Sequence, residues 1–215
     1  MLTVTTCLWD ANQHSRHFSR VYDESWAEKL YRSFAKNLTR PFRFVCFTDK
    51  QRTFAEPIEQ ERLIMQNPHY GACMEPFTLD CPQIFVGLDT IVVGNIDHLA
   101  DYAMTASKPA IPRDPFAGVG PWERTNAVVI APAGCRKMLL DGYAGENDMD
   151  WINTRDTDLL DELFPRQVVS YKGRIQRTGL EEETRIVYFH GPHKAHELAQ
   201  VGWIAREWHD NGRSV

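Results

Sequence analysis

Two short apolar runs flank an amphipathic segment at the start of the chain, in the order and spacing of a βαβ unit. The runs are Leu2 to Trp9 and Phe42 to Phe47, both rich in the β-branched and aromatic residues that favour strands. Between them, apolar side chains recur at four-residue steps from Trp26, which predicts a helix over Glu24 to Asn37. Because a helical crossover of this length joins parallel strands, the segment predicts a parallel sheet.

Later segments predict further strands and helices of the same domain. The predicted strands are Ile84 to Val93, Asn126 to Ala131, Val168 to Tyr171 and Ile186 to Phe189. Helical patterns cover Asp156 to Phe164 and Ala195 to His209. We find no repeat, low-complexity segment or linker. The sequence therefore predicts one α/β domain over residues 1–215, with a mostly parallel central sheet flanked by helices.

Composition narrows the class of protein. The chain has 215 residues, 43% of them hydrophobic, and a net charge of −5, which gives no general electrostatic reason to expect nucleic-acid binding. Its start lacks a signal-peptide pattern, and no window approaches the roughly 20 apolar residues that span a bilayer. The five cysteines are scattered and form no C-x-x-C pair, as expected in a reducing compartment. We therefore expect a cytoplasmic protein without a membrane span.

A carboxylate interrupts the most apolar of the predicted strands. Asp89 lies within Ile84 to Val93, a run that otherwise belongs in the core. An ionised Asp is rarely buried without a partner or a metal, so Asp89 is a candidate binding residue. The alternative is that the strand ends at Val86 and that Asp89 faces solvent.

The segment VYFHGPHK places His190 and Lys194 directly after the last predicted strand. In open α/β sheets, ligands bind at the carboxyl ends of strands, so both residues are candidates for a ligand site. The three-residue spacing of His190, His193 and His196 also suggests a zinc site. Gly191-Pro192 argues against it, because this pair breaks the helix that would align the three rings.

Taken together, five segments resemble elements of the family 8 glycosyltransferases, the group of glycogenin and the lipopolysaccharide galactosyltransferases. The resemblance rests on the order of these segments, which are Asp10-x-Asn12, Asp89 with the following TIVVGNID, Asn126-Ala127-Val128-Val129, Asp148-Met149-Asp150 and FHGPHK. It implies a GT-A fold, related to the Rossmann fold, and transfer of a sugar from a nucleotide-sugar donor, with a UDP-sugar favoured.

The resemblance implies a diphosphate site around the central strand. Asp89 and His190 would bind a divalent cation, Mn²⁺ or Mg²⁺, that bridges the donor diphosphate. Lys194 would neutralise the leaving diphosphate. This role fits the chemistry, since departure of a nucleoside diphosphate develops negative charge that a cation stabilises.

The remaining matched residues would hold the two ends of the donor. Asp10 and Asn12 would contact the nucleoside. Asn126, with Asp148 or Asp150, would face the transferred sugar. The acceptor is not identified: a glycan, a lipid-linked sugar, a protein side chain, a small metabolite and a modified nucleobase all fit.

Three departures from the family pattern keep alternatives open. Gly87 stands where the first Asp of the Asp-x-Asp motif is expected, Met149 replaces a Gln, and Cys73 or Met74 stands near the place of a usual lysine. The hypotheses are an active transferase, a catalytically inactive GT-A domain that binds nucleotide or carbohydrate, and a metal-dependent hydrolase built on the three histidines.

Overall fold

The strand–helix–strand unit is present in the computed structural model, which describes residues 1–210. It consists of β1 (Leu2–Leu8), α1 (Glu24–Asn37) and β2 (Phe42–Thr48). Strands β1 and β2 are parallel along their whole length, as predicted. The Asp23 side chain accepts a hydrogen bond from the backbone N–H of Ser25 and so begins α1 with an N-cap. The last five residues of the predicted domain, 211–215, lie outside the described part.

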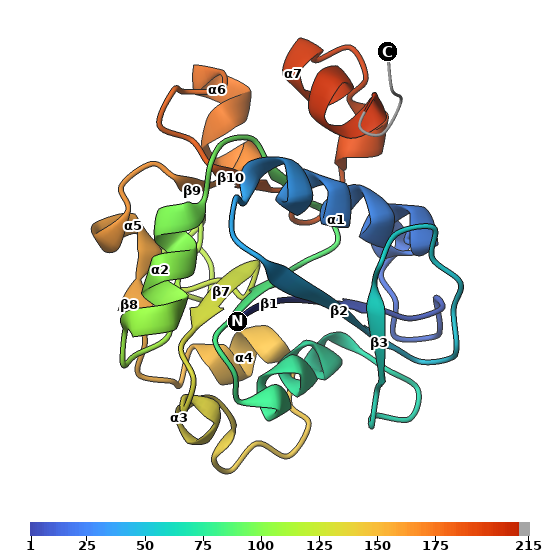
Figure 1. The fold of residues 1–215 in the computed structure, drawn as a ribbon, viewed down its shortest axis with the longest axis vertical. Coiled ribbons are helices and arrows are strands. Elements are labelled where there is room, and N and C mark those ends of the chain that lie inside the picture. Colours follow the sequence, from blue (N-terminus) through green and yellow to red (C-terminus); the bar gives the residue numbers. More distant parts are fainter. Residues whose placement is uncertain (211–215) are drawn as a thin grey trace.

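The central sheet has seven strands in the order β3-β2-β1-β4-β7-β6-β8 (Figure 1). The five strands not yet given are β3 (Glu59–Arg62), β4 (Gln83–Val86), β6 (Ala110–Ile111), β7 (Val128–Ala131) and β8 (Asp158–Leu159). Strands β3, β2, β1 and β4 are parallel, β7 is antiparallel to β4 and β6, and β8 is parallel to β6. The mostly parallel α/β architecture is thus confirmed.

Both faces of the sheet are covered, and the strands alternate between two cores. In β4, Ile84 and Val86 pack on one side and Phe85 packs on the other. Helices α1 and α2 (Asp97–Thr105) cover the first face. The second is covered by a 3₁₀ segment, Tyr70–Leu79, and by α3 (Arg136–Leu140) and α4 (Asp148–Ile152), which lie opposite α1 in Figure 1. Because successive side chains of a strand point to opposite faces, a strand between two cores such as β4 is buried along its whole length.

The single strand predicted over Ile84 to Val93 is wrong, because the chain divides it between two sheets. After β4, the backbone N–H of Gly87 bonds to the carbonyl of Ala127 at 3.1 Å, and the chain then turns away. Residues of β5 (Thr90–Val92) pair antiparallel with β10 (Ile186–Tyr188), and β10 pairs parallel with β9 (Val168–Ser170). The turn through Asp89 therefore lies between the seven-stranded and the three-stranded sheet.

Two predicted helices are shorter than the sequence suggested. Asp156 to Phe164 begins as β8 and becomes helical only in α5 (Leu160–Leu163), because Asp158 and Leu159 pair with β6. The tail is broken into the turns Ala195–Glu197, α7 (Gly202–Ile204) and Ala205–His209. The other short helical segments are His17–Ser19, Tyr171–Ile175 and α6 (Gln176–Thr178). Within residues 1–210, no helix has the length and apolar character to cross a membrane.

Candidate active site

A cleft of about 680 Å³ opens where β1 and β4 end and β7 begins. Its walls come from the segments that follow β1, β4 and β10 and from the loop that precedes β7. This is the edge at which open α/β sheets bind ligands. The cleft brings together five residues predicted from the sequence, namely Asp89, Asn126, Asp148, His190 and Lys194.

Asp89 and Lys194 form an ion pair inside this cleft. The ammonium of Lys194 contacts Oδ2 of Asp89, and the same oxygen accepts a hydrogen bond from the Tyr22 hydroxyl at 3.0 Å. The Lys194 side chain is only 3% exposed and that of Asp89 17%. Although the strand does end at Val86, the alternative that Asp89 faces solvent is therefore wrong.

Pairing between β5 and β10 explains how residues 105 positions apart meet. Tyr188 lies opposite Thr90 in the antiparallel pair, and the N–H of Phe189 bonds to the carbonyl of Asp89 at 2.9 Å. The ammonium of Lys194 also donates a hydrogen bond to the carbonyl of Phe189 at 2.7 Å, which holds the Lys194 side chain next to Asp89.

His190 is a neutral base at the cleft wall. Its Nε2 shares a hydrogen bond of 2.7 Å with the Ser170 hydroxyl, and its ring meets the edge of Phe116 at 5.3 Å. Burial, together with the positive charges of Lys172 and Lys194, lowers the pKa of His190 to about 4. At neutral pH the imidazole is therefore uncharged.

The predicted metal ligands do not make a donor set that fits Mn²⁺ or Mg²⁺. Asp89 Oδ2 is occupied by Lys194 and Tyr22, and His190 Nε2 is occupied by Ser170. Within residues 1–210, no group of three or more His, Cys, Asp or Glu side chains is placed to hold an ion. Hard divalent cations take about six ligands, mostly oxygens, and here one carboxylate is paired with an ammonium instead.

Gly87 also affects this donor set. A Cβ built at Gly87 would lie 2.9 Å from Oδ1 of Asp89, closer than real Cβ contacts allow. The Asp89 carboxylate thus occupies the space in which a side chain at position 87 would begin. A second carboxylate at this position would require Asp89 to move.

The three histidines do not share a centre, which removes the basis of the hydrolase hypothesis. His193 is 72% exposed, with its Nδ1 3.6 Å from a carboxylate oxygen of Glu197. His196 packs edge-on against the ring of Trp26 at 5.3 Å. His190 lines the cleft, whereas His193 and His196 do not, and no group of three metal-binding side chains forms within residues 1–210.

Asn126 and Asp148, which also line the cleft, form a buried pair. The Asn126 amide donates to Oδ2 of Asp148 at 3.1 Å, while its own backbone N–H donates to the sulfur of Met149 at 3.3 Å. Burial raises the pKa of Asp148 to about 6, so its carboxylate is mostly ionised at pH 7. The Oδ1 of Asn126 is buried and has no hydrogen-bond partner among the described residues. An acceptor atom without a partner beside a cleft is a natural contact for a ligand hydroxyl.

Asp150 lies apart from this pair. It is exposed, does not line the cleft, and accepts a hydrogen bond of 2.9 Å from the indole N–H of Trp122. Trp122 does line the cleft, in the loop that precedes β7. Of the two carboxylates that the sequence left open, Asp148 is the one that faces the cleft.

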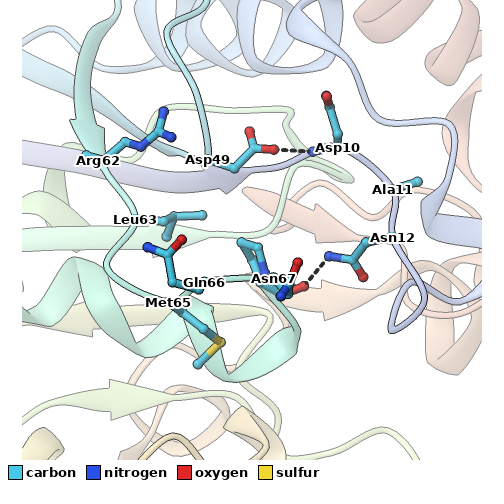
Figure 2. Close-up of a pocket in the computed structure, with 10 residues that line it drawn as sticks. Asp10, Ala11, Asn12, Asp49, Arg62, Leu63, Met65, Gln66 and Asn67 are labelled. Atoms are coloured by element: carbon cyan, nitrogen blue, oxygen red, sulfur yellow. Dashed lines mark hydrogen bonds between the residues drawn. The ribbon is translucent and has the colours of Figure 1, made fainter.

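Asp10 and Asn12 line a second, smaller pocket of about 270 Å³ beside the ends of β1, β2 and β3 (Figure 2). The backbone N–H of Asp10 bonds to Asp49 at 3.0 Å, and the Asn12 amide donates to the carbonyl of Pro68 at 2.8 Å. Trp9 lines the large cleft while Asp10 lines this pocket, so the two hollows are neighbours along the end of β1.

A buried arginine that the sequence analysis missed organises this second pocket. Arg52 is 3% exposed and pairs with three carboxylates, those of Asp10, Glu24 and Asp49, at 2.7 to 2.9 Å. Hydrogen bonds from Lys50 and Arg52 hold the pKa of Asp10 below its ordinary value. No local pattern around Arg52 signals this role, because its partners come from three separate segments.

Tyr22, Ser170 and Lys172 were also missed. The first two bond to Asp89 and His190, and Lys172 donates to the carbonyl of Pro192 at 2.7 Å, inside the segment that carries His190 and Lys194. Tyr22 and Lys172 lie outside the predicted strands, and Ser170 lies within the strand predicted over Val168 to Tyr171 without a motif, so only the folded arrangement identifies the three.

No protein-family model and no curated protein sequence matches the chain. Several solved structures do resemble it. The glycosyltransferase GlyE of Streptococcus pneumoniae TIGR4 is 13% identical, with a TM-score of 0.64 over 99% of this chain and 60% of that one. The bifunctional glycosyltransferase WbbM is 10% identical, with a TM-score of 0.63 over 99% of this chain and 50% of that one. This chain therefore spans only half to three fifths of those two structures.

The galactosyltransferase LgtC, solved in complex with donor and acceptor sugar analogues, is 12% identical. Its TM-score is 0.57, over 99% of this chain and 97% of that one. Structural similarity at such low sequence identity is evidence for the fold alone. It confirms the GT-A-type fold that the resemblance to family 8 implied.

Proposed function

We propose that this protein is a glycosyltransferase that moves a sugar from a nucleotide-sugar donor, with a UDP-sugar favoured, to an acceptor that is not identified. The observation that carries the proposal is the single cleft that joins the Asp89–Lys194 pair to the Asn126–Asp148 pair. The fold shared with LgtC, which binds donor and acceptor sugar analogues, supports this use of the cleft.

The donor would lie along the ends of the parallel strands. Its nucleoside would occupy the pocket of Asp10 and Asn12, and its diphosphate would extend into the cleft toward Lys194. In the reaction, the bond between sugar C1 and the β-phosphate oxygen breaks, and the electron pair leaves with the diphosphate. The acceptor oxygen forms the new bond to C1, and its proton passes to the departing diphosphate. A buried ammonium stabilises the negative charge of the leaving group most at the point where it is fully developed.

The Asn126–Asp148 pair would face the sugar. The free Oδ1 of Asn126 can accept a hydrogen bond from a sugar hydroxyl, and the ionised Asp148 can stabilise positive charge that develops at C1. Burial strengthens both interactions, because the effective dielectric constant in the cleft is low.

A catalytically inactive nucleotide- or carbohydrate-binding domain is the second candidate. Gly87 and Met149, which replace two polar residues of the family pattern, favour it. A screen for donor hydrolysis across nucleotide sugars, in Mn²⁺, in Mg²⁺ and in EDTA, separates the two. Hydrolysis or transfer of any donor supports the enzyme, whereas binding of donors without turnover supports the inactive domain.

A first prediction concerns binding alone. We expect UDP to raise the melting temperature, because a ligand that binds only the folded state stabilises it by mass action. At a UDP concentration of about 100 times Kd the gain is about 2.7 kcal/mol, which corresponds to a rise of roughly 5 to 10 °C for a domain of this size. Differential scanning fluorimetry with UDP, UMP and uridine measures this shift. If no nucleoside diphosphate produces a shift at millimolar concentration, the proposed function is wrong.

A further inference from the structure

We propose that Lys194 and Lys172 together hold the donor diphosphate, and that this site works without a divalent cation. The inference rests on the proposed function and departs from the dependence on Mn²⁺ or Mg²⁺ expected from the resemblance. It assigns to Lys172 a role that the sequence did not indicate.

The first step is the position of the Lys194 ammonium. It contacts Asp89, the one carboxylate of the predicted metal site, and donates to the carbonyl of Phe189 at 2.7 Å. Its third N–H has no acceptor among the described residues that would compete for it. With one N–H left to donate at the wall of the cleft, the ammonium can bind a phosphate oxygen while it stays paired with Asp89.

The second step is the position of Lys172. Its ammonium donates a hydrogen bond to the carbonyl of Pro192, as that of Lys194 does to the carbonyl of Phe189. Both lysines therefore bond to the backbone of the same loop, residues 189–194. A Cβ built at Gly191 would lie 3.1 Å from Nζ of Lys172. Gly191 lines the cleft and has a φ of +61° that favours glycine. The absence of a side chain at position 191 therefore leaves the Lys172 ammonium next to the cleft.

The third step is the balance of charge. His190 lies between the two lysines in sequence, and its ring is bonded to Ser170. Lys194 is paired with a carboxylate, that of Asp89, whereas the Lys172 ammonium donates to a backbone carbonyl and is in no ion pair among the described residues. A site of this charge attracts a diphosphate and disfavours an added divalent cation.

The last step is the missing second carboxylate. At position 87 the space is filled by Asp89 Oδ1, 2.9 Å from where a Cβ would be. No other His, Cys, Asp or Glu within residues 1–210 completes a group of three that could hold an ion. The Lys194 ammonium thus pairs with the carboxylate that the family pattern would give to a metal, and Lys172 bonds to the same loop.

Isothermal titration calorimetry of UDP into EDTA-treated full-length protein tests this inference. We expect UDP to bind, with a Kd that 1 mM Mn²⁺ or Mg²⁺ changes by less than about threefold. Lys172→Met keeps the aliphatic stem and should weaken UDP binding roughly tenfold, the size expected for one charge-assisted hydrogen bond. The same variant should change UMP binding much less, because UMP lacks the β-phosphate.

Lys137→Met is the matched control, because Lys137 is exposed on α3 and does not line the cleft. It should bind UDP as the wild type does, and circular dichroism should show both variants folded. Binding of UDP only in the presence of Mn²⁺ or Mg²⁺ overturns the inference and leaves the proposed function standing. Equal binding by Lys172→Met and wild type removes Lys172 from the site. Failure of UDP and other nucleoside diphosphates to bind under both conditions overturns the inference and the proposed function together.

Discussion

Asp148→Asn is expected to lower donor turnover by about 100-fold or more and, at the same time, to stabilise the folded protein at pH 7.5. The loss of activity follows from the loss of charge, since an amide keeps the shape of the carboxylate and its bond from Asn126 but cannot stabilise positive charge at C1. Turnover of the best donor in the hydrolysis screen measures this loss. The gain in stability has a separate cause in the pKa of Asp148.

Burial raises that pKa from 3.8 to about 6, so the folded state binds more protons than the unfolded chain between these values. Stability therefore falls as pH rises from about 4 to 6, and the loss is complete above about pH 6. A shift of about two pKa units corresponds to roughly 3 kcal/mol, which is the upper limit of what Asp148→Asn can restore at pH 7.5. Thermal melts of wild type and variant between pH 4 and 8 should converge at the acid end.

Asp150→Asn is the control for this experiment, because Asp150 is exposed and does not line the cleft. It should leave both the pH dependence of stability and the order of magnitude of turnover unchanged. If Asp148→Asn retains wild-type turnover while Asp150→Asn loses it, the assignment of the two carboxylates is reversed.

The elements predicted correctly are those whose periodicity reflects local burial. Helix α1 begins and ends where the apolar stripe and Asn37 indicated, and β1, β2, β7, β9 and β10 lie within one or two residues of their predicted runs. The run around Asp89 was misread because a strand and a turn of equal apolarity look alike when both are buried. Only long-range pairing of Thr90–Val92 with β10 divides it. The strands β6 and β8 were not predicted, because each has only two residues and so shows no periodicity in the sequence.

The residues of the candidate site likewise divide into those that the sequence identified and those that only the structure shows. Asp89, His190 and Lys194 could be found because polar residues at the ends of apolar strands stand out in the sequence. Their partners could not, because Tyr22 and Lys172 come from segments without an apolar pattern. The sequence also did not indicate that the fold brings the Lys194 ammonium to the carboxylate of Asp89.

Lys194→Met should lower turnover by about 1,000-fold, the largest loss that we expect from a single substitution at this site. Because its charge matters most when the leaving diphosphate is fully formed, kcat should fall more than donor affinity does. The substitution also leaves Asp89 without its counter-ion. Removing one partner of a buried ion pair costs roughly 3 kcal/mol, or about 6 to 12 °C in melting temperature for a domain of this size.

The double variant Lys194→Met/Asp89→Asn separates these two effects. Asp89→Asn alone should also destabilise the fold, since it removes the counter-ion of the Lys194 ammonium, whose side chain is 3% exposed. With both charges removed, no buried charge is left unpaired, so we expect the double variant to melt at a higher temperature than either single variant. Its turnover should stay as low as that of Lys194→Met, because the ammonium that faces the diphosphate is still missing. Recovery of turnover to within tenfold of the wild type would show instead that Lys194 only neutralises Asp89, and the leaving-group role would have to pass to another residue.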